Sequence, residues 1–149
     1  MNTRLFKLCG IAAAALAAAL LQPVHAQQSG STIQVTLNYT GSGTVDESHK
    51  IYVALWDSTD FMKGQARPLQ VESTSSKTGT VTFSSVKANP AYVSAAFDPT
   101  GKWDSQSGPP PSGSSLGMYS ETPGKPGPIS TGGKTATATI NFDDSVKVP

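Results

Sequence analysis

The sequence predicts an all-β protein, a single antiparallel β-sandwich of about seven strands behind a cleaved N-terminal signal helix, of the immunoglobulin-like or transthyretin-like type. Three observations predict it. Apolar residues recur at every second position in several short segments, turn-forming residues stand at the segment boundaries, and no segment after residue 26 has apolar residues at helical spacing. An open barrel is the alternative architecture.

The first segment, residues 1–26, has the three-part layout of a secretory signal peptide. Arg4 and Lys7 precede an apolar run over residues 8–21, and Val24-His25-Ala26 supplies a small-x-small cleavage pattern. The apolar run is shorter than the roughly 20 residues that a membrane-spanning helix needs. We therefore expect cleavage after Ala26, a periplasmic or secreted protein, and no stable membrane insertion after cleavage.

The composition of residues 27–149, which we expect to form one domain, excludes several classes of function. Loss of Arg4 and Lys7 takes the formal net charge from +1 to −1, so nothing favours nucleic acid or an anionic membrane as a partner. Cys9 is the only cysteine and is removed with the signal, so disulfides do not stabilise the domain. His49 is the only histidine left, which is too few for a typical transition-metal site.

The strands are predicted in the following order. Residues 31–40 alternate apolar and polar side chains, which is typical of a half-buried strand. Residues 50–56 are apolar on both sides, which predicts a strand covered, or nearly so, on both faces. Shorter strands are expected around residues 69–71, 78–83 and 92–97. A last strand is expected at residues 135–142, where threonines alternate with apolar residues and favour a strand over a helix.

Residues 98–133 are predicted to form a long loop, because they are rich in Pro, Gly and Ser and no long element fits them. A loop of this length in a compact domain is uncommon and is usually functional or mobile. Four apolar residues within it predict that the loop is partly held against the sandwich, namely Leu116, Met118, Tyr119 and Ile129.

The middle of the chain has a recurring order of short motifs. These are I-Y-V-A-L-W at 51–56, Phe61, V-T-F at 81–83, A-Y-V-S-A-A-F-D at 91–98, G-M-Y-S at 117–120 and G-P-I at 127–129. This order resembles bacterial exported domains of the domain-of-unknown-function family 2141, and more loosely carboxypeptidase-regulatory-like and transthyretin-like modules. The resemblance implies a transthyretin-like sandwich without a known catalytic role.

Three aromatic residues are candidates for a ligand-binding platform, Trp56, Trp103 and Tyr119. Flat ring faces beside polar loops suit the binding of sugar rings. In the alternative interpretation, Trp56 belongs to the core, and Trp103 and Tyr119 close the long loop onto it.

A second candidate site is the glycine loop that contains Asp98, Thr100 and Asp104, whose oxygens could bind calcium. Calcium is the one cofactor that the sequence suggests. Lys102 lies between these residues and would compete with a cation, and the loop lacks the Asp-x-Asn-x-Asn-Gly pattern common in the families it resembles. The alternative is a turn that ends a strand.

The sequence predicts no catalytic residues. Gly113-Ser114-Ser115-Leu116-Gly117 matches the G-x-S-x-G pattern, but no helix follows it and His49 precedes the serine. The enzymatic alternative is a glycan hydrolase with a carboxylate pair drawn from Asp57, Asp60, Asp98 and Asp104.

We therefore expect an exported, non-enzymatic module that binds an unknown protein or glycan partner or has a structural role in the cell envelope. The alternative is a calcium-stabilised or carbohydrate-binding module that uses the loop at residues 98–120.

Overall fold

The computed structural model describes residues 30–64 and 66–149, so the predicted signal peptide lies outside the described residues. None of the helices in those ranges is long and apolar enough to cross a membrane. The described elements are β1 (Ser31–Tyr39), β2 (Ile51–Trp56), the 3-10 helix η1 (Thr59–Lys63), β3 (Gln70–Thr74), β4 (Thr78–Val86), β5 (Tyr92–Phe97), β6 (Ser115–Met118) and β7 (Thr135–Phe142).

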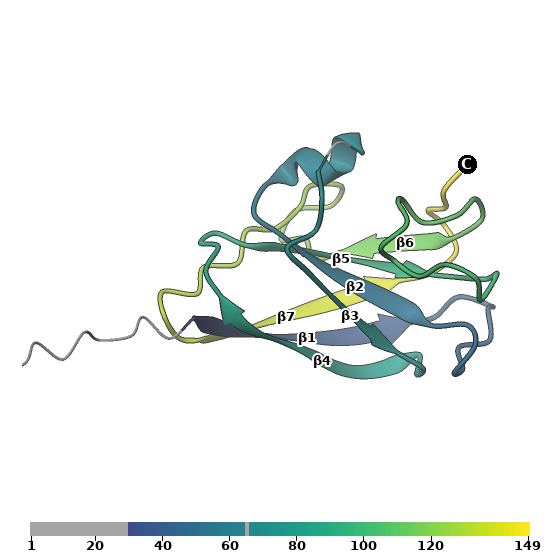
Figure 1. Ribbon diagram of the computed structural model, residues 1–149, viewed down its shortest axis with the longest axis horizontal. Helices are drawn as coiled ribbons and strands as arrows, with labels where there is room; N and C mark the ends of the chain where they lie inside the picture. The colour runs from purple at the N-terminus through teal and green to yellow at the C-terminus, as the bar shows by residue number, and fades with distance from the viewer. Residues whose placement is uncertain (1–29, 65) are drawn as a thin grey trace, which may run out of the picture.

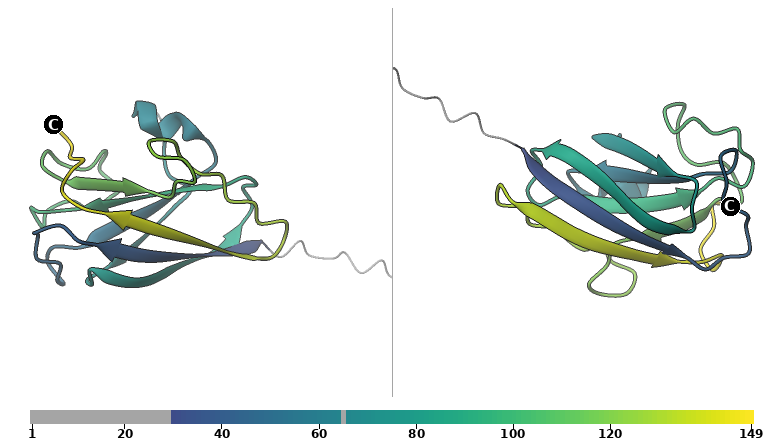
Figure 2. Two further views of the ribbon diagram at one scale, coloured as in Figure 1. Left: turned by 180° about the vertical axis from the view of Figure 1, so that it is seen from behind. Right: turned by 90° about the horizontal axis from the view of Figure 1, so that it is seen from below.

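The strands form two sheets that pack face to face, which confirms the predicted β-sandwich (Figures 1 and 2). One sheet has the order β4-β1-β7 and the other the order β3-β2-β5-β6. The pairs are antiparallel except β1 with β7, which run parallel from Thr32 opposite Thr135 to Tyr39 opposite Phe142. The expectation of an antiparallel sandwich is therefore wrong at this pair. Two parallel neighbours must be joined by a long crossover connection, and the chain between β1 and β7, which is nearly the whole domain, provides it.

The core lies between the sheets and follows the period-two patterns of the strands. Every second residue of β1 and β2 faces inward and is buried, and the residues between them face outward. Burying one large aliphatic side chain stabilises a fold by about 1.5–3 kcal/mol. The side chains with no exposed surface include Ile33, Val35, Ile51, Val53, Leu55, Phe83 and Ile140.

The outer face of the β4-β1-β7 sheet is polar and uncharged. Its exposed positions include Gln34, Thr36 and Asn38 of β1, flanked by threonines of β4 and β7. Asn38 donates a hydrogen bond across the sheet to Asn141 (3.3 Å), and the hydroxyls of Thr36 and Thr80 lie 3.4 Å apart. Threonine favours exposed strands, so this face is a solvated surface that we use below as a control.

The stretch predicted to be a long loop is interrupted by β6, which pairs with β5. As expected, apolar residues hold this stretch against the sandwich, since Ile129 is buried and bridges to Ala91. The outer edge of β6 is covered by the C-terminal residues, because the Leu116 N–H donates to the carbonyl of Val146 (2.8 Å). A Cβ atom on Gly117 would lie 2.6 Å from the Cβ atom of Phe142, so only glycine permits this approach of β6 to β7.

Asp144, which follows β7, joins three separate segments of the chain. Its carboxylate accepts hydrogen bonds from the hydroxyls of Tyr39 (2.6 Å) and Ser115 (2.7 Å) and from the N–H and hydroxyl of Ser42 (2.8 Å each). These bonds, that of Tyr39 foremost, hold the pKa of Asp144 well below its usual value of 3.8. Burial, followed by the bond to Asp144, raises the pKa of Tyr39.

Candidate ligand-binding groove

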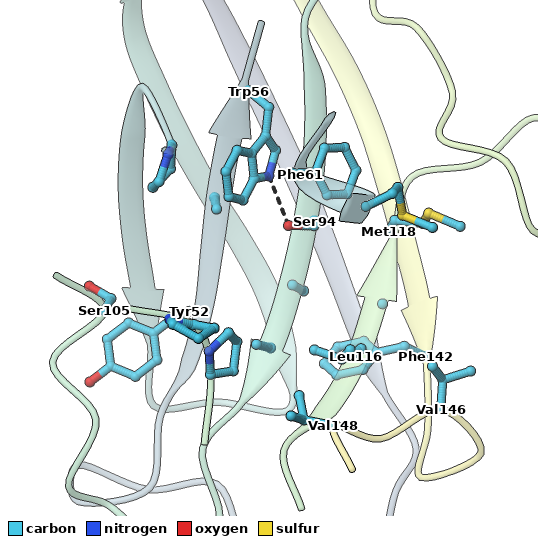
Figure 3. A pocket seen from close by; sticks show the side chains of 18 of the residues that line it. Tyr52, Trp56, Phe61, Ser94, Ser105, Leu116, Met118, Phe142, Val146 and Val148 are labelled. Carbon is cyan, nitrogen blue, oxygen red and sulfur yellow. Dashed lines mark hydrogen bonds between the residues drawn. The ribbon is translucent and has the colours of Figure 1, made fainter. Parts of the chain in front are cut away.

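The outer face of the β3-β2-β5-β6 sheet differs from that of the other sheet, because small side chains lie at its centre and large ones at its margins. Strand register places Tyr52 beside Ala96 and Ala54 beside Ser94, so these four residues lie on one face. Leu116 and Met118 of β6 continue the same rows. The result is an open groove of 1510 Å³, which we call the outer groove (Figure 3).

One end of the outer groove is formed by Trp56, at the end of β2. Its indole N–H donates to the Ser94 hydroxyl (2.9 Å), as Figure 3 shows, and its ring stacks on Phe61 with centroids 5.0 Å apart. Phe61 is carried by η1, which lies outside the sheet in Figure 1. Because the Ser94 oxygen already accepts the indole N–H, its own proton remains available for donation to a ligand.

The local sequence explains why η1 holds Phe61 in place. The hydroxyl of Ser58 accepts the N–H of Asp60 (3.4 Å) at the start of the helix, and Gly64 ends it in the left-handed conformation (φ 69°). Lys63 donates to Asp60 across one turn (2.9 Å). A short segment with a capping serine and a terminal glycine therefore positions an aromatic ring over the sheet.

The other end of the outer groove is formed by Tyr52 and Trp103. The two rings meet edge to face with centroids 4.8 Å apart, and the Tyr52 hydroxyl donates to the carbonyl of Trp103 (2.9 Å). The indole N–H of Trp103 donates to the carbonyl of Gly108 (3.2 Å). Burial raises the pKa of Tyr52, with a further contribution from the negative charges of Asp98 and Asp104.

Asp98 positions Trp103. Its carboxylate is 1% exposed and accepts the N–H and hydroxyl of Thr100 (2.8 and 2.7 Å) and the N–H of Trp103 (2.9 Å). Burial raises the pKa of Asp98, but the hydrogen bonds from Thr100 and Trp103 outweigh it, so the pKa is lowered. Asp98 is therefore a buried anion that organises the loop from residue 98 to residue 103.

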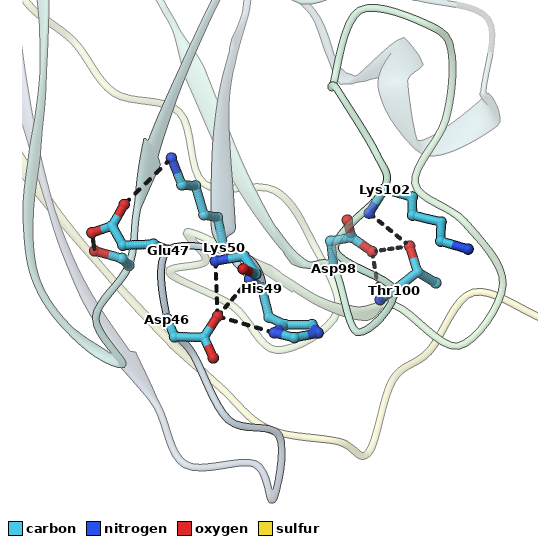
Figure 4. A network of polar contacts seen from close by, with 9 residues as sticks. Asp46, Glu47, His49, Lys50, Asp98, Thr100 and Lys102 are labelled. Atoms are coloured by element: carbon cyan, nitrogen blue, oxygen red, sulfur yellow. Dashed lines mark hydrogen bonds and ion pairs between the residues drawn. The ribbon is translucent and has the colours of Figure 1, made fainter.

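The same loop packs against the turn at residues 46–49 (Figure 4). Gly101 has a φ of 65°, and a Cβ atom on it would lie 2.6 Å from the carbonyl oxygen of Ser48. In that turn, Asp46 accepts the N–H of His49 (2.8 Å), and the His49 Nδ1 lies 3.0 Å from the same carboxylate oxygen. Each of these two segments is therefore held by its own aspartate, the loop by Asp98 and the turn by Asp46.

The predicted calcium ligands Asp98, Thr100 and Asp104 form hydrogen bonds within this loop. Thr100 and Asp98 are brought together by bonding each other. Asp104 accepts the backbone N–H groups of Gln106 (2.9 Å) and Ser107 (2.7 Å), and the bonds from Ser107 foremost lower its pKa. Within residues 30–64 and 66–149, no cluster of three His, Cys, Asp or Glu residues is arranged to hold a metal ion.

Of the three predicted aromatic residues, the outer groove brings Trp56 and Trp103 together along one sheet face. Tyr119 does not line it. Its side chain packs against the core, its hydroxyl donates to Glu121 (3.2 Å), and a Cβ atom on Gly127 would lie 2.8 Å from its ring.

Sequence reasoning missed Tyr52, Phe61 and Ser94 as lining residues. The available signal was the second face of residues 50–56, where Tyr52, Ala54 and Trp56 alternate with the core residues. That pattern predicts a strand covered, or nearly so, on both faces, and the structure leaves these three residues half-buried.

Comparisons with known proteins give no independent guide to the outer groove. No family model, no curated protein and no solved structure matches the chain. The chemistry of the groove itself is therefore the basis for inferring its function.

Proposed function

We propose that the protein is an exported, non-enzymatic β-sandwich module that binds a partner in the outer groove, in the periplasm or outside the cell. The observation that carries the proposal is the arrangement of two aromatic pairs, Trp56 with Phe61 and Tyr52 with Trp103, around a floor of small side chains. Concave sites with aromatic walls and few polar groups are typical of ligand recognition.

The state of three of the four candidate carboxylates, Asp60, Asp98 and Asp104, supports binding rather than glycan hydrolysis. Asp98 is buried and fully used in its loop, and Asp60 pairs with Lys63 (2.9 Å). A glycosidase needs one carboxylic acid whose pKa is raised, whereas the pKa values of Asp98 and Asp104 are lowered. These side chains act as acceptors for backbone N–H groups.

We also propose that the sandwich is transthyretin-like and that the chain belongs with the exported domain-of-unknown-function family 2141. The order of short motifs from residue 51 to residue 129 supports this assignment. The two-sheet architecture is compatible with it.

A capture experiment tests the binding role. Protein expressed from the full-length sequence and recovered after export is immobilised as wild type, Trp103→Ala and Thr139→Ala. The last is a matched control, because Thr139 is exposed on the opposite sheet beside Thr36. Each is incubated with fractionated envelope polysaccharide and protein, and the retained material is analysed by mass spectrometry and sugar composition.

We expect the wild type and Thr139→Ala to retain one specific component that Trp103→Ala loses. Identical retained material on all three proteins would count against the outer groove as the binding site.

A further inference from the structure

The outer groove carries almost no charge. Among the described residues that line it, Arg67 and Asp143 are the only ones with charged side chains, and both are exposed. Away from these two exposed side chains, a charged ligand buried here would lose hydration without gaining an ion partner, which is unfavourable. The groove therefore favours a neutral ligand.

The aromatic rings at its two ends offer apolar surface rather than hydrogen bonds. The indole N–H groups of Trp56 and Trp103 and the hydroxyl of Tyr52 are already paired within the protein. Tyr52 and Trp56 are four residues apart on β2, so the two aromatic pairs lie roughly 13 Å apart along the strand. This spacing suits an elongated ligand with apolar surface near both ends.

Neutral polar groups lie between and beside the rings. The Ser94 hydroxyl retains its proton for donation from the groove floor. Ser105, Gln106 and Ser107 line the side formed by the loop after Trp103. A ligand that alternates apolar ring faces with hydroxyl groups satisfies both kinds of surface.

Two other neutral ligands fit less well. An acyl chain would leave the proton of the Ser94 hydroxyl without an acceptor, which is unfavourable. A peptide that binds by adding a strand needs a free sheet edge. The edge of β6 is covered by Val146 and Val148, which leaves only β3, at the opposite margin of the groove, as an edge strand.

We propose that the outer groove binds a neutral carbohydrate chain along β2 and β5. One sugar ring packs on the Trp56 and Phe61 pair, another packs on the Tyr52 and Trp103 pair, and the Ser94 hydroxyl donates to a sugar oxygen between them. This inference rests on the proposed function, in which the outer groove is the ligand site.

Intrinsic fluorescence provides a direct probe, because the chain has two tryptophans and both line the outer groove. The exported protein is titrated with neutral gluco-, xylo- and N-acetylglucosamine oligosaccharides, and binding is followed by tryptophan emission and calorimetry. An acidic oligogalacturonate and an extended apolar peptide serve as comparison ligands. Protection from acrylamide quenching is measured on the wild type, which needs no variant.

We expect at least one neutral series to bind saturably, to protect the tryptophans from quenching, and to bind about tenfold more tightly as an oligomer than as a monosaccharide, because the oligomer reaches both aromatic pairs. Trp103→Ala and Ser94→Ala should each weaken binding about tenfold, the equivalent of about 1.4 kcal/mol. Thr139→Ala should bind like the wild type. Urea midpoints confirm that each variant is folded.

The outcomes separate this inference from the proposed function. Binding of the acidic oligosaccharide, lost in Trp103→Ala, would overturn the assignment of a neutral ligand. Binding of the peptide, lost in the same variant, would overturn the carbohydrate assignment. Either result would leave the groove as the site. Neutral oligosaccharides that bind the wild type and Trp103→Ala equally would overturn the groove itself. Failure of every neutral series to bind would refute the carbohydrate inference.

Discussion

Replacing Asp144 with alanine should destabilise the fold far more than is usual for an aspartate near the surface. The change removes the acceptor for the hydroxyls of Tyr39 and Ser115, residues that are 2% and 1% exposed. A buried donor without an acceptor costs about 1–3 kcal/mol, so the two together predict a loss of about 3 kcal/mol in the free energy of unfolding. The donors of Ser42 are exposed to water, which replaces the lost acceptor.

The same contacts make stability depend on pH. The pKa of Asp144 is lowered in the folded protein from 3.8, chiefly by the hydrogen bonds from Tyr39, Ser115 and Ser42. The unfolded chain therefore binds a proton more readily, so the contribution of Asp144 is complete above the unfolded pKa and is lost as the pH falls toward the folded value. Below about pH 4, the wild type should lose stability more steeply than Asp144→Ala.

Urea unfolding followed by tryptophan emission measures both effects, at about pH 7 and again below about pH 4. Asp143→Ala is the matched control, because the neighbouring carboxylate is exposed and accepts the N–H of Ser145 (2.8 Å) within its own turn. The reasoning is refuted if both variants lose the same free energy at neutral pH. It is equally refuted if the wild type and Asp144→Ala have the same pH dependence.

Three further predictions address packing, metal binding and export. Gly117→Ala should cost about 1–3 kcal/mol by urea unfolding, because the new Cβ atom would meet Phe142 at 2.6 Å, and unchanged stability would contradict this close approach. Millimolar calcium should leave the melting temperature unchanged, because Asp98 and Asp104 already accept backbone N–H groups, and a shift of several degrees would restore the calcium hypothesis. Amino-terminal sequencing of the exported protein should begin directly after Ala26, and an intact amino terminus would exclude cleavage.

Most of the fold could be predicted because its strands are encoded locally. Alternation of apolar and polar side chains located the strands around β1, β2, β4, β5 and β7. The pattern missed β6, because a four-residue strand with a central glycine has too few side chains to show a period. The alternation pattern also could not predict the parallel pairing of β1 with β7, since an amphipathic strand does not specify which strand lies next to it.

The candidate site was predictable only in part. The sequence singled out Trp56 and Trp103, which the fold places in one groove, but also Tyr119, which the fold places against the core. Phe61 lies in a five-residue 3-10 helix that carries no periodic signal, and its role depends on stacking against Trp56. Asp144 was missed because its partners lie up to 105 residues away.

By itself, the sequence determined an all-β domain with most of its strands and its core faces, because these follow from the two-residue period of a single strand. Only the tertiary structure decided which strands are neighbours and which outer face is hollowed. The face of β2 that carries Tyr52, Ala54 and Trp56 has the same period as its core face. It lines a groove because no third layer formed by the described residues covers it and because η1 and the loop after Asp98 bring aromatic rings to its two ends.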